Sequence, residues 1–314
     1  MKRSVIAAIA LMFAALAYGD DGNLSGLVFY EFSHEFDETL AVNNAFEMQR
    51  VYLTYQKEIS PALVYKFQTD VARDRDSWLT VYLKNAKMDW TTSLGKVTFG
   101  LQGMNVFNVQ EKTWGHRYLE KSPMDKSGFA SSVDMGIGYA RSLGDHLHMD
   151  AKVTNGTGYK KPEDDKFKKL SMQLVWGETD LTKQDGFNVG GVATYEPFEE
   201  ADGTSAATTV IALLGGWSHE SLRAGVEFNL ESQSDVSDAT QIMAGYATYA
   251  LHHKLAVLTR IDILTEESNT ETYAIVGIAL TPEKGLRITP NMRYVKEGVS
   301  QGWTSFRVNL EFKI

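Results

Sequence analysis

The sequence contains no cysteine. This absence excludes a disulfide framework, a metal site with thiolate ligands and an N-terminal cysteine that carries lipid. Long apolar runs are also missing: after the first residues, no stretch reaches the roughly 18–20 apolar residues of a membrane-spanning helix. Prolines number only six, whereas 26 glycines suit a chain with many turns and few long helices.

Basic residues are in the minority, at 31 Lys and Arg against 40 Asp and Glu, and the formal net charge is −9. A nucleic-acid partner would call for a basic face, so we expect none. The turn sequences at 218–220 (Ser-His-Glu) and 252–253 (His-His) lack the spacing of a nucleophile elbow or a catalytic triad. We therefore expect no enzyme, no cofactor and no metal site.

The N-terminus has the organisation of a secretory signal peptide. A basic start at Lys2 and Arg3 precedes the apolar run Val5–Leu16, and a small-residue site follows it at Ala17–Gly19. The apolar run is too short for an anchor helix. We predict a signal peptide at 1–19 and a single domain at 20–314, with a formal charge of −11 once Lys2 and Arg3 are removed.

Apolar and polar residues alternate along the rest of the chain. At the C-terminus, every even-numbered position from Phe306 to Ile314 is apolar and every odd-numbered position from Ser305 to Lys313 is polar or charged. A strand places successive side chains on opposite faces, so this segment has one apolar and one polar face. Sixteen such stretches are predicted, at 24–34, 46–58, 62–72, 78–91, 95–104, 130–142, 146–155, 168–178, 186–196, 207–218, 221–231, 240–251, 254–264, 272–281, 286–295 and 304–314.

The links between these stretches alternate in length. Most even-numbered links are tight turns rich in Pro, Gly, Asp and Ser, whereas the odd-numbered links include the long segments 35–45, 105–129 and 156–167. A transmembrane barrel has short periplasmic turns and longer outer loops. The sequence therefore predicts an all-β fold: one transmembrane antiparallel up-and-down β-barrel of about 16 strands, with both termini periplasmic. A soluble β-protein also alternates, but so many strands with one apolar face each favour the membrane barrel.

Two stretches depart from simple alternation. Segment 78–91 has charge on both faces, at Lys84, Lys87 and Asp89, which requires a β-bulge or an early exit from the membrane. Segment 207–218 is apolar on both faces, so we expect it to lie beside something packed inside the barrel.

Over residues 24–314 the chain resembles the sixteen-stranded bacterial outer-membrane porins. Within that range, Phe46–Leu53 and the following Pro61–Arg73 strand are similar to the phosphate-selective porin group. The resemblance implies an outer-membrane location, contact with outer-membrane lipid and lipopolysaccharide, small hydrophilic solutes or ions as cargo, and a homotrimer.

Porins of this group fold the third outer loop into the lumen to narrow the pore. The third odd-numbered link here is 105–129, the longest in the chain, and its charged and aromatic residues suit a constriction. The resemblance thus predicts a constriction built from Glu111, Lys112, Trp114, His116, Arg117, Tyr118, Glu120, Lys121, Asp125 and Lys126. An ordinary outer surface loop remains the alternative.

Strand alternation predicts which charges line the lumen. The cations are Arg50, Lys66, Lys152, Arg223, Arg260, Arg287, Arg293, Arg307 and Lys313, and the anions are Glu31, Asp70, Asp150, Glu227, Glu231, Asp262 and Glu311. Arg287, Arg293 and Arg307 fall on the last two strands and could form one basic wall that favours anions. The alternative, which we favour, is a salt-bridged lining with weak selectivity.

Two functions therefore stay open. The first is a porin for passive diffusion of small hydrophilic solutes and ions, with or without a preference for anions such as phosphate. The second is a structural or surface-interaction barrel with a plugged lumen.

Overall fold

The computed structural model describes residues 22–36, 44–73, 79–163, 165–234, 236 and 238–314; the predicted signal peptide, 1–19, lies outside these ranges. The strands are β1 (Asn23–Glu35), β2 (Asn44–Ser60), β3 (Leu63–Arg73), β4 (Leu79–Thr92), β5 (Gly95–Gly103), β6 (Val133–Leu143), β7 (Leu147–Thr154), β8 (Lys169–Gly177), β9 (Gly186–Glu199), β10 (Ser205–His219), β11 (Leu222–Gln233), β12 (Thr240–His252), β13 (Leu255–Glu266), β14 (Asn269–Glu283), β15 (Leu286–Glu297) and β16 (Trp303–Lys313). Two short helices, α2 (Asn108–Trp114) and α3 (Pro123–Ser127), lie in the link between β5 and β6.

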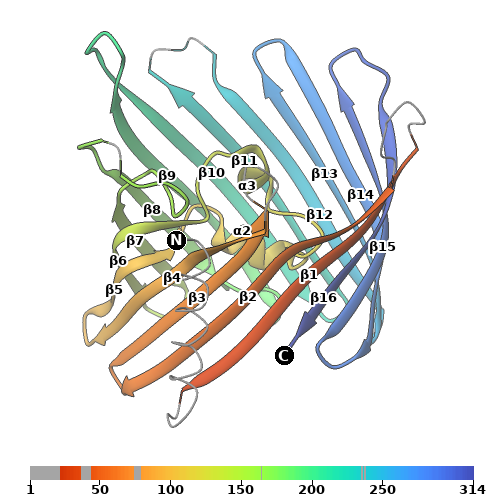
Figure 1. Cartoon of the computed structure of the whole chain (residues 1–314), viewed down its shortest axis with the longest axis horizontal. Helices are drawn as coiled ribbons and strands as arrows, with labels where there is room; N and C mark the ends of the chain where they lie inside the picture. Colours follow the sequence, from red (N-terminus) through yellow and green to blue (C-terminus); the bar gives the residue numbers. More distant parts are fainter. Residues whose placement is uncertain (1–21, 37–43, 74–78, 164, 235, 237) are drawn as a thin grey trace.

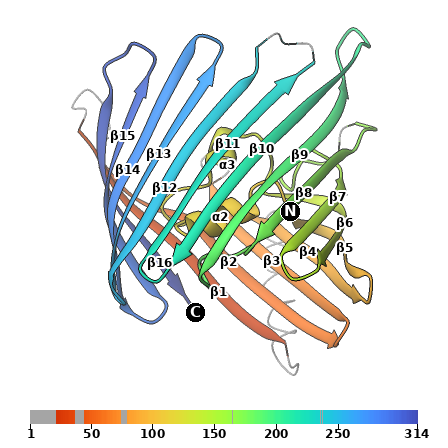
Figure 2. The same ribbon diagram turned by 180° about the vertical axis from the view of Figure 1, so that it is seen from behind.

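Each strand pairs with its neighbours in sequence, and β1 pairs with β16 to close the barrel (Figures 1 and 2). At this seam Val28 lies opposite Phe312, and Gly26 and Ile314 exchange two backbone hydrogen bonds of 2.9 Å. Closure leaves no unpaired sheet edge, and barrels of 16 to 18 strands enclose an aqueous channel. The prediction of an all-β up-and-down barrel of sixteen strands is confirmed.

The two faces of the sheet differ in polarity. On β11, Val226 points outward and is 63% exposed, whereas its neighbour Glu227 points inward and is 4% exposed. On β8, Leu170 and Met172 are exposed while Ser171 between them is buried. An apolar outer face around a polar interior is typical of a barrel surrounded by lipid. No helix within the described ranges is both long and apolar enough to cross a membrane.

A β-bulge on β4 explains why its sequence carries charge on both faces. Gln68 of β3 lies opposite Asn85, but the next residue, Thr69, lies opposite Leu83, so Lys84 has no counterpart. Both Lys84 and Asn85 are consequently buried in the interior. A bulge inserts one extra residue and thereby reverses which positions face inward. Of the two alternatives that the sequence left open, a bulge or an early exit from the membrane, the structure shows the bulge.

Strand β10 is apolar on both faces because its inner face is covered. Ile211 and Leu213 point outward and are about half exposed, whereas Val210 and Ala212 are fully buried against side chains from the link between β5 and β6. The expectation that this strand lies beside something packed in the lumen is confirmed.

The strands on one side of the barrel, here called the low side, are shorter than the others. Strands β5, β7 and β8 contain nine, eight and nine residues, whereas β2 and β10 contain 17 and 15. Two long links, residues 104–132 and 155–168, start from this low side (Figure 1). Both bear on the candidate site.

Candidate functional site

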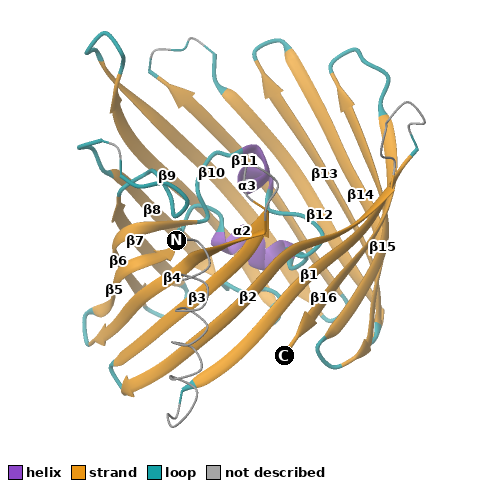
Figure 3. Cartoon of the chain, in the orientation of Figure 1, coloured by secondary structure: helices purple, strands orange, loops and turns teal. Residues whose placement is uncertain are grey.

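The link of residues 104–132, here named the constriction segment, lies inside the barrel (Figure 3). Its helices α2 and α3 end at Gly115 (φ 74°) and Gly128 (φ 80°), both in the left-handed conformation that allows a helix to stop sharply. Ser122 caps α3 by accepting a hydrogen bond from the backbone N–H of Asp125. The prediction that the third odd-numbered link folds into the lumen is confirmed.

Apolar side chains attach the constriction segment to the wall. Phe107, Met124 and Phe129 form one buried cluster with Val210 of β10 and Ile242 of β12. Burying a large apolar side chain contributes about 1.5–3 kcal/mol. The segment is therefore a fixed part of the interior and not an open surface loop.

Trp114 is the centre of a second contact. Its side chain is fully buried, its ring centroid lies 5.5 Å from that of Tyr246, and the guanidinium of Arg260 lies 5.4 Å from its ring centre. Its indole N–H donates to the carbonyl of Glu120 at 3.1 Å. The indole therefore joins the two halves of the constriction segment to β12 and β13.

Arginines of the wall hold the backbone of this segment. Arg223 donates from Nε to the carbonyl of Thr113 at 2.8 Å, and Arg293 donates from Nη2 to the carbonyl of Leu119 at 2.8 Å. Arg287 donates to the carbonyl of Gly115 at 3.3 Å. These guanidinium groups donate hydrogen bonds to carbonyls at helix ends and in loops that would otherwise lack a partner. The arginines thereby position the constriction segment.

Each cation of the predicted basic wall has carboxylate partners. Arg287 pairs with Glu311, Arg293 with Glu31 at 3.2 Å, and Arg307 with Glu31 at 2.8 Å. This part of the lining is salt-bridged, in agreement with the interpretation that we favoured from the sequence.

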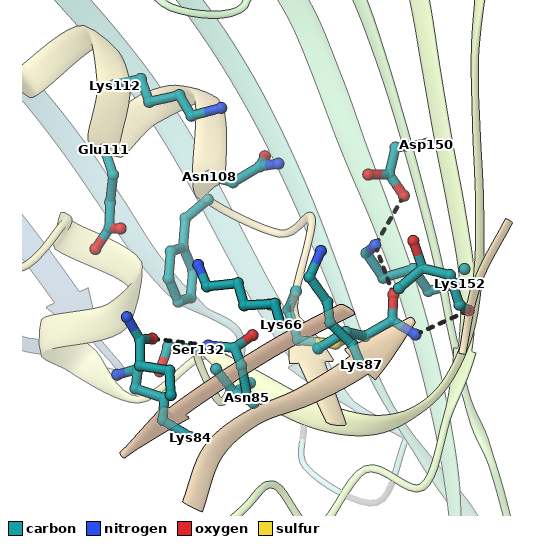
Figure 4. A pocket seen from close by; sticks show the side chains of 18 of the residues that line it. Lys66, Lys84, Asn85, Lys87, Asn108, Glu111, Lys112, Ser132, Asp150 and Lys152 are labelled. Atoms are coloured by element: carbon teal, nitrogen blue, oxygen red, sulfur yellow. Dashed lines mark hydrogen bonds and ion pairs between the residues drawn. The ribbon is translucent and has the colours of Figure 1, made fainter. Parts of the chain in front are cut away.

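An open cavity of about 590 Å³ lies between α2 and strands β1 to β7, with Glu311 of β16 also in its lining. Figure 4 shows Lys66, Lys87 and Lys152 extending from the wall into this space, with Glu111 and Lys112 of α2 facing them. The cations of its lining are Lys66, Lys84, Lys87, Lys96, Lys112, Arg117 and Lys152, and its acids are Glu111, Asp150 and Glu311. We name it the lysine cavity.

The cations of the lysine cavity differ in their pairing. Lys87 contacts Asp89 at 2.8 Å and Lys152 contacts Asp150 at 3.1 Å. Within the described ranges, Lys66, Lys96 and Lys112 make neither an ion pair nor a side-chain hydrogen bond. Unpaired ammonium groups on both sides of the cavity produce a positive potential in a confined space.

A second, smaller cavity of about 150 Å³ lies between the constriction segment and strands β1, β2, β15 and β16. Arg117 and Phe29 line both cavities, while Glu31, two residues further along β1, lines only the smaller one. The two spaces therefore adjoin each other at Arg117 and Phe29. Its guanidinium is held by Glu111 at 2.7 Å and Asp125 at 3.1 Å.

Charges of the constriction segment are tuned by burial and by neighbours. Burial raises the pKa of Glu111, and nearby Arg117 only partly opposes this. Against the effect of burial, the guanidiniums of Arg293 and Arg260 lower the pKa of Glu120. Burial, together with Arg223 and Arg287, lowers the pKa of His116 well below its usual range, so its imidazole is neutral where it contacts Thr248 at 2.8 Å.

The predicted site residues divide into three groups. The first group faces the lysine cavity: Glu111, Lys112, Arg117 and Lys66. The second group joins the constriction segment to the strands, or one strand to another: Trp114, His116, Tyr118, Glu120, Arg223, Arg260, Arg287, Arg293 and Arg307. The third group makes other side-chain pairs: Lys121, Asp125, Lys126, Arg50, Asp70, Asp262, Glu227 and Glu311. Sequence reasoning did not identify Lys84, Lys87 or Lys96 as lining residues. For Lys84 and Lys87 the signal was present in the sequence, because a single bulge on β4 turns both side chains inward; Lys96 lies on β5.

No group of three or more His, Cys, Asp or Glu side chains suitable for a metal ion is found in the described part of the chain. The chemistry that the lumen offers is charge and hydrogen bonding along a passage.

Neither a protein-family model nor a curated protein sequence matches the chain. Solved structures do. The anion-selective porin from Comamonas acidovorans aligns with a TM-score of 0.70 at 10% identity, covering 94% of this chain and 99% of that one. OmpT of Vibrio cholerae in its trimer form aligns with a TM-score of 0.69 at 12% identity, over 93% and 99%. OmpF of Salmonella typhi, solved with daunomycin, aligns with a TM-score of 0.65 at 12% identity, over 93% and 97%. At these identities the likeness establishes the fold: the chain has the sixteen-strand barrel of the outer-membrane porins.

Proposed function

We propose that this protein is an outer-membrane porin, a water-filled channel for the passive diffusion of small hydrophilic solutes and ions that favours anions. The observation that carries the proposal is the lysine cavity. Its unpaired ammonium groups, Lys66, Lys96 and Lys112, face a passage whose other walls are neutralised by ion pairs. Fixed charges lining a narrow passage set the sign of the ions that enter it. The similar fold of an anion-selective porin agrees with this preference.

The remaining assignments follow from the same proposal. Residues 1–19 direct export and are removed, no catalytic activity is involved, and both chain ends lie on the periplasmic side, where tight turns belong. Lipid and lipopolysaccharide surround the apolar outer face. A homotrimer is proposed from the family resemblance, and one similar structure is described as a trimer.

A plugged structural barrel is the second candidate, because the constriction segment is firmly packed and the cavity beyond Arg117 measures only about 150 Å³. The test is single-channel recording of the purified, folded protein in a planar bilayer, with the reversal potential measured in a KCl gradient. We expect stepwise open-channel current and a reversal potential on the chloride side. A folded barrel without current would support the plugged alternative, and a potential on the potassium side would contradict the anion preference.

A further inference from the structure

A second segment, residues 155–163 after β7, reaches the inner face of the barrel, where Tyr159 contacts the buried Asp70. The backbone N–H of Gly156 donates to Asp134 at 2.6 Å. Gly158 has a φ of +76°, and a Cβ there would lie 2.5 Å from the hydroxyl oxygen of Ser131. The turn therefore packs directly against the end of the constriction segment, and this contact requires glycine.

Tyr159 connects this segment to β3, a strand that is not adjacent to β7. Its hydroxyl donates to Oδ2 of Asp70 on β3 at 3.1 Å, and its ring meets that of Tyr82 on β4 edge-on, with centroids 6.1 Å apart. Along the wall, β4, β5 and β6 separate β7 from β3. Burial raises the pKa of Tyr159 above its usual range, with the Asp70 carboxylate adding to the effect, so the hydroxyl remains a donor.

Asp70 is the point where three elements meet. It is fully buried, and its Oδ2 also accepts from Arg50 of β2 at 2.8 Å and lies 3.8 Å from the ammonium of Lys84. Lys84, the bulged residue of β4, lies between two rings, 5.1 Å from the centre of Tyr52 and 5.3 Å from that of Tyr159. Cation–π contacts of this kind fix an ammonium group in place.

Lys160, the next residue, lies beside Tyr82 and within electrostatic range of the constriction segment. The Lys160 ammonium lies 4.7 Å from the ring centre of Tyr82. Partial desolvation lowers the pKa of Lys160, and among the charges that act on it are Lys121 and Asp125 of the constriction segment. Segment 155–163 and the constriction segment are thus within electrostatic range of each other.

We propose that segment 155–163 is a second constriction element, and that Tyr159, anchored on Asp70 beside Arg50 and Lys84, narrows the lumen on the side of β2 to β4 and limits the size of the anions that pass. This rests on the proposed channel function. Asp70 is then a positioning residue: its charge is used by Arg50, Lys84 and Tyr159. Arg50, Lys84 and Arg117 are paired with carboxylates, whereas the Lys160 ammonium lies over the ring of Tyr82 and adds a positive charge on this side, consistent with an anionic solute.

The absence of cysteine makes a direct test available. A Tyr159→Cys variant is reconstituted in bilayers and treated with 2-sulfonatoethyl methanethiosulfonate, which adds a bulky anionic group to a thiol. We expect the single-channel conductance to fall by about twofold or more, because the added group narrows the lumen beside the constriction segment. Lys160→Cys is the second variant, since its exposed side chain leaves the Asp70 anchor intact; the same fall is expected.

The matched control is Ala201→Cys, on the exposed link between β9 and β10, whose modification should leave conductance unchanged. Mass spectrometry establishes that each thiol is modified. Unchanged conductance in the fully modified Tyr159→Cys and Lys160→Cys variants would overturn the second constriction while leaving the channel function intact. A wild-type protein that conducts no current would overturn both.

Discussion

The guanidinium of Arg293 on β15 lies 3.2 Å from the carboxylate of Glu120 in the constriction segment, so the wall of the barrel and the segment inside it are joined by an ion pair. The same guanidinium contacts Glu31 of β1 at 3.2 Å, and the side chains of Arg293 and Glu31 are each only 5% exposed. One cation therefore connects the closing seam of the barrel with the element that narrows its lumen.

Replacing Arg293 with Met should destabilise the protein, because the buried carboxylates of Glu31 and Glu120 would lose the cation that neutralises their negative charge. Removing one partner of a buried ion pair costs about 3–5 kcal/mol. The measurement is the temperature at which the folded barrel loses its distinct electrophoretic mobility. Arg141→Met, at an exposed position of β6, is the control. Equal transition temperatures for the two variants would show that the pair is not structurally important.

Trp114→Ala should loosen the constriction segment without preventing barrel closure. The indole is fully buried and bonded to Glu120, and such truncations cost about 3–5 kcal/mol. We expect larger and noisier single-channel currents than in the wild type. Trp176→Ala, on the outward face of β8, should leave the current unchanged. If the Trp114→Ala variant showed the same current and noise as the wild type, the apolar cluster of Phe107, Met124 and Phe129 would be sufficient to hold the constriction segment.

Lys66→Gln should move the reversal potential toward potassium, because Lys66 is an unpaired cation of the lysine cavity. The shift should be larger at 0.1 M than at 1 M salt, since the Debye length falls from about 10 Å to about 3 Å. Lys254→Gln, at the exposed turn between β12 and β13, is the control for overall charge. Similar shifts for both variants would assign selectivity to the total charge and not to the cavity.

Anion preference should rise as the pH falls from 7 toward 5. Burial raises the pKa of Glu111, so this carboxylate becomes neutral at a higher pH than an ordinary glutamate. Its protonation leaves the positive charges of Arg117 and Lys84 less compensated, with Asp125 beside Arg117 and Asp70 beside Lys84 as the remaining nearby acids. The reversal potential, measured as a function of pH, checks this. Glu111→Gln should remove the change above pH 5, and an unaltered pH profile would assign it to another group.

Much of the fold could be predicted from alternation because a lipid-facing wall imposes one rule at every strand. The pattern of β11 is typical: Val226 points outward and Glu227 inward, as predicted. Even the departures were informative. Charge on both faces of β4 indicated a bulge or an early exit from the membrane, and the structure has a bulge at Lys84. The two apolar faces of β10 indicated something packed in the lumen, which is the constriction segment.

The roles of the lumen charges could not be predicted in the same way. Alternation places Arg293 and Lys66 alike on the inner face, yet one is enclosed by carboxylates and carbonyls and the other faces open space. Which of these occurs depends on where the constriction segment lies, and that position results from contacts between residues more than a hundred positions apart, such as Arg223 with Thr113.

The sequence by itself determined the barrel, its strand number and the side of each strand that faces lipid, because these follow from a local period of two. Only the tertiary structure decided which charges are free and which are used. It showed that the arginines of β11 to β15 hold the constriction segment, that the lysines opposite remain in the passage, and that Tyr159 reaches Asp70. The physical reason is that charge pairing depends on distance across the lumen, and no local pattern of residues encodes that distance.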